Sequence, residues 1–575
     1  MSAVAASGIV RLPVWRARVV MCAMLAAFAV LAGRSVYLQA MHTGFLQEKG
    51  EARYSRVLEM PGTRGRILDR HGEALAISTP VQSVWAIPED VVATPAQLKR
   101  LATLLGADPR ELQKRLADSS RDFVYLKRQI APEQAEQVAR LGLPGVHQHR
   151  EFRRYYPGGE VTAHLVGFTG LDEAGQEGIE LAHQASLGGA PGSRRVIKDR
   201  LGRVVEDIES IRAAQDGKDL QLSIDGKIQS LAYSALKVAL AEHRAQAGAA
   251  VAIDVRTGEV LALVNLPSFN PNNRAKLSGA QLRNRVLTDA FEPGSTLKPF
   301  TVALALELGK VTPRSVVSSG RDPLRIANYT IHDPHPEGAL NVAQVIQKSS
   351  NVGAAKIALS LPREDLWDLF NRAGFGNAPQ LGFPGEASGR LRPARSWQPV
   401  EQATMAYGHG ISVSLAQLAR AYTMFARDGE LVPLTLVRSD AKVAGRRVIS
   451  PQTAQAVRAM LELAVQPGGT APRARIMGWR VAGKTGTAHK QENGGYAPEK
   501  YISSFVGLAP VSDPRIVVAV MIDEPSAGKY YGGVVAAPVF ATITQGALRL
   551  LGVPHDAPLE PVPLPGEGEE AREST

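Results

Sequence analysis

The chain opens on its longest apolar stretch. Residues 19–38 are uncharged and mostly apolar, interrupted once by Arg34, and three arginines precede them. A run of this length is about enough to cross a bilayer as a helix, and positive charge before it keeps the N-terminal side in the cytoplasm. The pattern predicts a cytoplasmic segment 1–18, a transmembrane helix 19–38 and an exported remainder. A cleavable signal peptide is a weaker alternative, because no convincing A-x-A site follows the run, and a buried core helix fits poorly with so uniform a run near the N-terminus.

Beyond the anchor, the hydrophobic pattern changes twice. Residues 44–215 combine short alternating runs with turn signals, and amphipathic helical spacing occurs only near 95–118 and 132–141. A polar loop follows, and the alternation in residues 220–224 predicts a strand that opens a second domain. We therefore expect a β-rich module at 44–215 and a second domain at 220–550.

The second domain has strand patterns at both ends and helical periodicity between them. Two β-rich runs, 249–254 and 259–264, flank a hairpin signal, and strand signals return at 479–483, 501–507 and 515–522. Helical spacing covers residues 300–310, 341–360, 400–426, 451–465 and 536–550. Strands from the two ends must then meet in one antiparallel sheet with helices packed on it, so the predicted fold class is multidomain α+β.

Composition adds three points to this picture. Lysine and arginine outnumber aspartate and glutamate by 66 to 55, and the net charge of +11 favours an anionic membrane surface or acidic polymer as a neighbour. The basic residues form no single tract and aromatics are only 6%, which argues against nucleic acid. The one cysteine, Cys22, excludes an intramolecular disulfide and a cysteine-rich metal site.

Residues 551–575 are acidic and proline-rich, and we predict that this tail is disordered.

The candidate chemistry comes from three short motifs. The pattern S-x-x-K begins at Ser234, Ser295, Ser439 and Ser526. Only Ser295 follows a Pro-Gly turn and precedes a helical pattern, which stacks Lys298 on the same face. A helix N-terminus favours a developing oxyanion, and a buried lysine there can be neutral and act as a base. The second motif, S-x-N at Ser349 and Asn351, interrupts a helical pattern, so its side chains can project into a cleft.

The third motif, K-T-G, occurs once and lies on the predicted strand 479–487. Lys484 supplies positive charge, Gly486 lets a substrate backbone approach, and Thr485 and Thr487 offer hydroxyls to a carboxylate. Each motif alone would fit an ordinary helix start, polar loop or glycine-rich edge strand. Their order, each in a suitable structural setting, predicts a serine active site.

In this order the motifs resemble those of the penicillin-recognising serine enzymes. Residues 64–72 match the R-G-x-I-x-D-R-x-G stretch of class B penicillin-binding proteins, and residues 170–180 and 199–203 resemble the same non-catalytic module. Residues 283–298, with R-N-R, T-D and F-E-P-G-S-T-L-K, look most like the cell-division (FtsI-like) subtype. The resemblance implies one transmembrane helix, an elongated β-rich pedestal for dimerisation or interaction, and a serine transpeptidase domain.

The same resemblance implies an inner-membrane peptidoglycan D,D-transpeptidase with a periplasmic catalytic domain. Ser295 would attack the penultimate D-alanine carbonyl of a stem peptide, expel the terminal D-alanine and pass the acyl group to an amine on a neighbouring stem. Lys298 would be the base and Ser349 would carry the proton to the leaving amine. Asn351 would hold Lys298 and the substrate amide, and Lys484 would complete the electrostatics.

The backbone N–H groups of Ser295 and Thr487 would form the oxyanion hole, and no metal or organic cofactor is implied. The implied partners are stem peptides on lipid-linked or nascent glycan, a membrane-embedded glycan polymerase and other division proteins, with β-lactams as covalent inhibitors. Arg34 either reaches the interface or contacts the polymerase.

Three alternatives share the fold and differ in the reaction or its place. An elongation-type transpeptidase would act on the lateral wall, and a D,D-carboxypeptidase or β-lactamase would use water as the acceptor. A non-catalytic β-lactam sensor or scaffold would use the pedestal for protein contacts. No further carboxylate motif for activating water follows S-x-N, and the nucleophile, the base and K-T-G are intact, so the transpeptidase is favoured.

Overall fold

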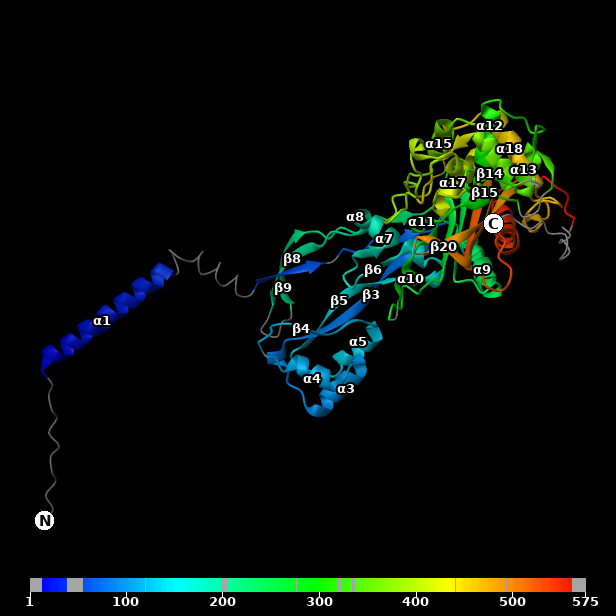
Figure 1. Ribbon diagram of the computed structural model, residues 1–575. Coiled ribbons are helices and arrows are strands. Elements are labelled where there is room, and N and C mark those ends of the chain that lie inside the picture. Colours follow the sequence, from blue (N-terminus) through cyan, green and yellow to red (C-terminus); the bar gives the residue numbers. More distant parts are fainter. Residues whose placement is uncertain are drawn as a thin grey trace, which may run out of the picture.

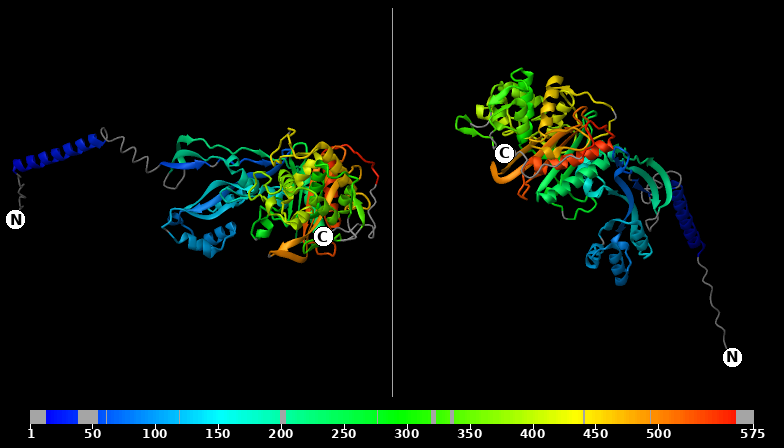
Figure 2. Two further views of the ribbon diagram at one scale, coloured as in Figure 1. Left: turned by 45° about the horizontal axis from the view of Figure 1, so that its top comes forward. Right: turned by 90° about the vertical axis from the view of Figure 1, so that its right-hand side faces the viewer.

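The computed structural model describes residues 13–38, 55–60, 62–118, 120–198, 204–275, 277–318, 323–333, 337–439, 441–492 and 494–560. Residues 1–12 of the predicted cytoplasmic segment, the motif at 199–203 and residues 561–575 of the tail lie outside the described residues. Figures 1 and 2 show an N-terminal helix, a narrow β-rich pedestal and a larger domain of sheet and helices.

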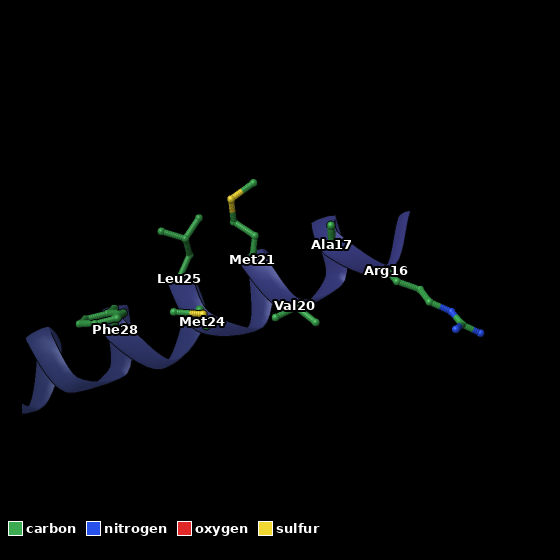
Figure 3. A pocket seen from close by; sticks show the side chains of 7 residues that line it. All are labelled: Arg16, Ala17, Val20, Met21, Met24, Leu25 and Phe28. Atoms are coloured by element: carbon green, nitrogen blue, oxygen red, sulfur yellow. The ribbon is translucent and has the colours of Figure 1, made fainter. Parts of the chain in front are cut away.

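The N-terminal helix α1 (Val14–Val36) begins earlier than the predicted span and has no buried residue. Its mean hydropathy reaches 2.0 over the most apolar window. Figure 3 shows Met21 and Leu25 projecting from it, with Arg16 near its N-terminal end. One other described stretch, Gly532–Leu550, is long and apolar enough to span a membrane, but it is 56% buried in the catalytic domain. The exposed apolar surface of α1 fits a membrane anchor.

The centre of the pedestal is a five-stranded sheet built around β3, which pairs with three other strands. Its strands are β2 (Ile67–Leu68), β3 (Ala74–Ala86), β4 (Val124–Ile130), β5 (Val146–Tyr155) and β10 (Leu220–Gln221). Val84 and Leu126 pack on α3 (Pro95–Leu105), α4 (Pro109–Leu116) and α5 (Pro132–Ala139). The helix pattern at 95–118 is two helices, because Gly106 adopts a positive φ of 58°. A second sheet joins β1 (Ser55–Met60), β8 (Gly192–Lys198) and β9 (Val204–Arg212).

Two arginines and one glutamate form a buried ion triad that fixes Arg64, the first residue of the R-G-x-I-x-D-R-x-G stretch. Glu180 is fully buried and accepts from Arg64 Nε at 2.6 Å and from Arg154 Nε at 2.7 Å. Removing one partner of such a group would leave an uncompensated buried charge, which costs about 3–5 kcal/mol.

Short elements connect β5 to β8: α6 (Ala163–Val166), β6 (Phe168–Thr169), β7 (Gly175–Glu177), α7 (Gly178–Ala182) and α8 (Gln184–Leu187).

The junction between the two domains differs from the expectation. The predicted strand at 220–224 is only β10, and it pairs in parallel with β2 of the pedestal rather than opening the catalytic sheet. Asp225 then caps α9 (Gly226–Glu242), a helix that the sequence analysis missed. Asp69 of the pedestal accepts from Gly226 N at 3.2 Å, so both domains cap this helix. The two domains are therefore joined by secondary structure, since β10 extends the pedestal sheet and a pedestal carboxylate caps α9.

The catalytic sheet is antiparallel with the order β12-β11-β21-β20-β19. The strands are β11 (Ala247–Asp254), β12 (Val260–Leu266), β19 (Ala482–Glu492), β20 (Gly495–Ala509) and β21 (Ile516–Asp523). This confirms that the first hairpin and the last strands meet in one sheet, as expected for the α+β class. The predicted strand at 479–483 is displaced, because β19 starts only at Ala482 and continues to Glu492.

Helices cover both faces of this sheet, and every residue of β11 and β21 is buried. One face packs on α9 and α20 (Ala537–Leu550), and the other on a larger helical group. That group contains α12 (Lys298–Glu307), α13 (Val342–Lys348), α14 (Asn351–Leu359), α15 (Arg363–Arg372), α16 (Pro399–Met405), α17 (Leu415–Ala426) and α18 (Pro451–Leu463). The predicted helices at 341–360 and 400–426 are each broken in two, at Ser349 and at a glycine-containing turn.

The start of the predicted disordered tail is ordered. Trp479 Nε1 donates to the Pro554 carbonyl oxygen at 2.9 Å, and the ring centroids of Trp479 and His555 lie 4.1 Å apart. Arg480 N donates to Asp556 Oδ1 at 2.7 Å. These contacts pack residues 551–560 on the catalytic domain, so the prediction of disorder was wrong for that part.

Candidate active site

Ser295 stands on a tight turn that feeds a buried helix. Residues Gly294–Leu297 form a 3-10 turn, and α12 begins at Lys298. Tyr422 OH donates to the Thr296 carbonyl oxygen at 2.7 Å, which fixes the turn from the helical side. Ser295 is only 3% exposed. Ser295 therefore lies between a turn and a helix, as the sequence predicts.

Lys298 meets the S-x-N motif. Its Nζ donates to Ser349 Oγ at 3.0 Å and also to the Ser349 carbonyl oxygen. Ser349 adopts a left-handed backbone, φ 61°, between α13 and α14. Such a conformation is rare for a residue with a side chain and costs about 1–3 kcal/mol. Here it turns both oxygens of Ser349 toward the buried lysine.

Lys484 of β19 reaches the same hydroxyl. Its Nζ donates to Ser349 Oγ at 2.9 Å and to Thr485 Oγ1 at 3.2 Å. Lys298 and Lys484 are both fully buried. The structure thus gathers the S-x-x-K, S-x-N and K-T-G motifs around one serine oxygen, although their residues are far apart in the sequence.

The hydroxyls of Thr485 and Thr487, which the sequence predicts to face a substrate carboxylate, are buried and contact groups of the protein itself. Thr485 Oγ1 is 3.0 Å from Thr470 Oγ1, and Thr487 Oγ1 accepts from Gly532 N at 3.1 Å. A Cβ at Gly486 would lie 2.7 Å from the Pro293 carbonyl oxygen. The absent side chain therefore makes room for the protein's own nucleophile turn, and not for a substrate backbone as the sequence predicts.

Asn351 is the first residue of α14, and a carboxylate that the sequence analysis missed positions it. Asp333 accepts from Asn351 N at 2.6 Å, from Val352 N at 3.0 Å and from the Ser350 hydroxyl. Asp333 follows the hairpin of β14 (Leu324–Ile326) and β15 (Tyr329–Ile331). A carboxylate on the free N–H groups of a helix start stabilises that end. No motif links Asp333 to S-x-N, so sequence spacing could not have found it.

Two further groups near the nucleophile were also missed. Glu292 accepts from Gly410 N and Gln491 Nε2, both at 2.8 Å, and burial raises the pKa of its carboxyl. Burial lowers the pKa of His409 to about 4, and the charge of Lys298 acts in the same direction. Within the described ranges, no group of three His, Cys, Asp or Glu side chains could hold a metal ion.

Comparisons with known proteins match the chain in two parts. The family "Penicillin binding protein transpeptidase domain" matches residues 248–545, and "Penicillin-binding Protein dimerisation domain" matches residues 59–222. The probable peptidoglycan D,D-transpeptidase PenA of Neisseria gonorrhoeae is 43% identical over 544 residues, which are 94% of this chain and 93% of that protein. Peptidoglycan D,D-transpeptidase FtsI of Escherichia coli K12 is 43% identical over 549 residues, with the same shares.

Solved structures resemble the chain as well. The transpeptidase domain of penicillin-binding protein 3 from Burkholderia pseudomallei is 52% identical, with a TM-score of 0.55, over 59% of this chain and 98% of that one. A peptidoglycan synthetase from Bifidobacterium adolescentis is 25% identical, with a TM-score of 0.69, and covers 88% of this chain and 99% of its own.

Proposed function

The chain belongs to the class B penicillin-binding proteins, and from this premise we propose that it is the transpeptidase that cross-links peptidoglycan stem peptides at the division septum. The observation that carries its chemistry is the buried contact of Lys298 and Lys484 with Ser349 Oγ, next to the turn of Ser295. Two buried ammonium groups around one hydroxyl would repel each other, so the arrangement favours one neutral amine that can accept a proton.

Acylation is the first half of the proposed reaction. Lys298 takes the hydroxyl proton of Ser295 as the oxygen attacks the penultimate D-alanine carbonyl. Backbone N–H groups of Ser295 and Thr487 stabilise the oxyanion, and Lys484 adds positive charge. The C–N bond then breaks, and the proton held by Lys298 passes through the Ser349 hydroxyl to the amine of the departing D-alanine. The products are a serine ester and free D-alanine.

Transfer is the second half. An amine on a neighbouring stem peptide attacks the ester carbonyl and loses a proton through the same Ser349–Lys298 contact. The ester C–O bond breaks, Ser295 regains its proton and the new amide is the cross-link. Asn351 holds the substrate amide, and β19, which carries Lys484, Thr485 and Thr487, is the strand that receives the substrate. A β-lactam acylates the same serine and blocks this second half.

The proposed location follows from α1 and its charges. We place α1 in the inner membrane, residues 1–18 in the cytoplasm, and the pedestal and catalytic domain in the periplasm. A membrane-embedded glycan polymerase is the proposed partner. Arg34 lies near the C-terminal end of α1, with its guanidinium 5.5 Å from the Tyr37 ring. Arg34→Ala should reduce co-purification with the polymerase while penicillin labelling persists, and an undiminished complex would contradict that contact.

Labelling with a fluorescent penicillin tests the active-site assignment. Ser295→Ala should lose all labelling, and mass spectrometry of the wild-type adduct should locate it on Ser295. Ser234→Ala is the matched control, because it removes an exposed serine from another S-x-x-K and should label like the wild type. An adduct on Ser234, Ser439 or Ser526 would refute the assignment.

Two further measurements separate the alternatives. Incubation with stem peptides should yield cross-linked dimers together with free D-alanine, whereas hydrolysis without dimers would indicate a D,D-carboxypeptidase. Depletion in cells should give filaments. Round cells that still divide would indicate elongation rather than septation.

A further inference from the structure

A groove of about 660 Å³ lies where the turns of β11–β12 and β20–β21 meet the end of α17 and the start of α18. Its lining contains none of the motif residues, and the proposed reaction makes no use of it. The volume falls within the roughly 300–1,000 Å³ of ligand sites. Five cationic side chains line this basic groove: Arg256, Arg427, Lys442, Arg447 and Arg458.

The lining carries more positive charge than its own carboxylates neutralise. Arg427 Nη2 lies 3.1 Å from Glu430 Oε2, and Arg447 Nη2 lies 3.0 Å from Glu430 Oε1, so two guanidinium groups share one carboxylate. Lys442 makes no ion pair with any described side chain. The remaining cations and acids of the lining match one to one, in the pairs Arg458–Asp428 and Arg256–Asp513. Two positive charges are therefore left for an anionic ligand.

Backbone carbonyl groups hold two of the arginines in place. The Arg427 side chain is 13% exposed, and its Nη1 donates to the Val255 carbonyl oxygen at 2.9 Å. The Arg458 side chain is 11% exposed, and its Nη1 donates to the Phe425 carbonyl oxygen at 3.1 Å. A carbonyl oxygen carries no net charge, so both guanidinium groups stay positive. Because they are already ordered, less conformational entropy is lost when an anion binds.

The C-terminal part of the chain passes the edge of the basic groove. Asp556 accepts from Ser512 N at 3.2 Å and from Ser512 Oγ at 2.8 Å, and Ser512 is one of the lining residues. The described chain ends four residues later, at Glu560. The residues that follow Glu560 therefore start close to the groove.

The sequence after Glu560 matches the basic groove in charge and in length. Residues 561–575 contain four glutamates and one arginine, which leaves three negative charges. Three prolines lie between Glu560 and Glu567, and a proline-rich spacer extends by about 3.1 Å per residue, or about 22 Å over these seven residues. The four residues from Asp556 to Glu560 cover at most about 14 Å. The spacer is thus long enough to bring the glutamates back to the groove.

We propose that the glutamates of residues 567–573 dock in the basic groove of the same molecule, so that the acidic tail is an internal ligand of the catalytic domain. Their carboxylates pair with the guanidinium groups of Arg427 and Arg447 and with the ammonium of Lys442. A short tether gives the glutamates an effective concentration in the millimolar range, so weak pairs suffice. Such pairs are screened by salt, which makes the docking reversible. The docked tail keeps other acidic chains out of the groove.

Carbodiimide cross-linking of the full chain in detergent tests the docking. The reagent joins a carboxylate to an amine in contact with it, and Lys442 is the one lysine of the lining. Mass spectrometry should find an amide between Lys442 and a glutamate of residues 567–573. Lys237 is the matched control, because it is exposed on α9, which covers the other face of the catalytic sheet. The Lys442 link should be about fivefold more abundant than any Lys237 link and should fade in 1 M salt, where the Debye length is about 3 Å.

A variant of the groove tests which charges hold the tail. Arg447→Gln removes an exposed cation and should lower the yield of the Lys442 link by about threefold. Arg140→Gln removes an exposed arginine of the pedestal and should leave the yield unchanged. Titration with benzylpenicillin counts the folded molecules in each preparation.

A synthetic peptide of residues 561–575 tests whether the groove is occupied in the wild type. The comparison is a full chain with Glu567→Gln, Glu569→Gln, Glu570→Gln and Glu573→Gln, which should leave the groove empty. The peptide should bind this variant about tenfold more tightly than the wild type, because a tethered competitor at millimolar effective concentration is removed.

Every other result would overturn the docking. Equal yields of the Lys442 and Lys237 links would show a tail without a preferred site, and an unchanged yield in penicillin-competent Arg447→Gln would exclude the groove. Links found only between isotope-labelled and unlabelled copies would make a second copy the occupant. Equal binding of the peptide to wild type and variant, or binding to neither, would also contradict it. None of these results changes the transpeptidase assignment, which penicillin titration tests in the same samples.

Discussion

Replacing Thr470 by valine should slow acylation although Thr470 is none of the motif residues. Lys484 Nζ donates to Thr485 Oγ1 at 3.2 Å, so the hydroxyl proton of Thr485 must point elsewhere. Thr470 Oγ1, 3.0 Å away and buried, is the oxygen placed to accept it. Valine keeps the shape of threonine but removes this acceptor. The hydroxyl of Thr485 then has to rotate, and Lys484 loses a fixed partner.

The size of the effect follows from one buried hydrogen bond. Such a bond contributes about 0.5–1.5 kcal/mol, and a buried donor left without a partner costs about 1–3 kcal/mol. If about 1–2 kcal/mol of this cost destabilises the transition state through the contact of Lys484 with Ser349, the rate of acylation falls by roughly five- to thirty-fold. Thr470→Ser restores the oxygen and should recover most of the rate. The melting temperature should fall by only a few degrees.

The assay is the second-order rate of acylation by a fluorescent penicillin, measured with thermal unfolding on the same preparations. The expected order of rates is wild type, then Thr470→Ser, then Thr470→Val. A Val variant that acylates at the wild-type rate would show that the Thr485 hydroxyl does not need Thr470. Equal losses in the Ser and Val variants would assign the effect to packing instead.

Three other substitutions extend the same reasoning. Lys484→Ala should lower the acylation rate roughly a hundred- to a thousand-fold at an unchanged melting temperature, because a preorganised charge is lost; an unchanged rate would refute its role. Asp333→Asn should slow acylation by about tenfold, since the N-terminus of α14 loses its carboxylate, and Glu337→Gln, which removes a partly exposed pair with Lys348, is the control. The pKa of His409, about 4 in the folded protein, lies below its ordinary value of 6.5, so the unfolded chain binds more protons between those pH values. Stability should therefore fall as the pH drops through that window, by up to about 3 kcal/mol, and His409→Gln should flatten the dependence in pH-dependent denaturant titrations.

Much of the fold and of the site could be predicted from the spacing of residues close together in the sequence. The motif of Ser295 and Lys298 depends on one helical turn, and the hairpin follows from two β-rich runs, 249–254 and 259–264, with a turn signal between them, so both could be predicted from neighbouring residues. The meeting of the first hairpin and the last strands in one antiparallel sheet was also predictable, because strands at both ends of a domain have to pair; the order of the strands within the sheet was not predicted. The resemblance to a known family then joined the three motifs in one site.

Contacts between distant segments account for what was missed. Thr470, Asp333 and Glu292 reach the site from loops that carry no pattern of their own. The break at Ser349 depends on a left-handed residue that is not glycine, which no propensity would suggest. Helix α9 was missed because its buried face, Ile228, Ala232, Leu236 and Ala239, follows directly on a strand signal. Residues 551–560 are ordered by Trp479, a partner outside their own composition.

The glycines around the nucleophile limit how this enzyme can evolve under an antibiotic. A Cβ at Gly408 would lie 2.2 Å from the Gly294 carbonyl oxygen, just as one at Gly486 would meet Pro293. Any side chain at either glycine would displace the nucleophile turn and slow acylation by the natural substrate as much as acylation by the drug. Selection for reduced penicillin affinity should therefore act at residues other than these, and resistant variants raised in the laboratory should keep both glycines. A resistant, fully active variant with alanine at either position would contradict this.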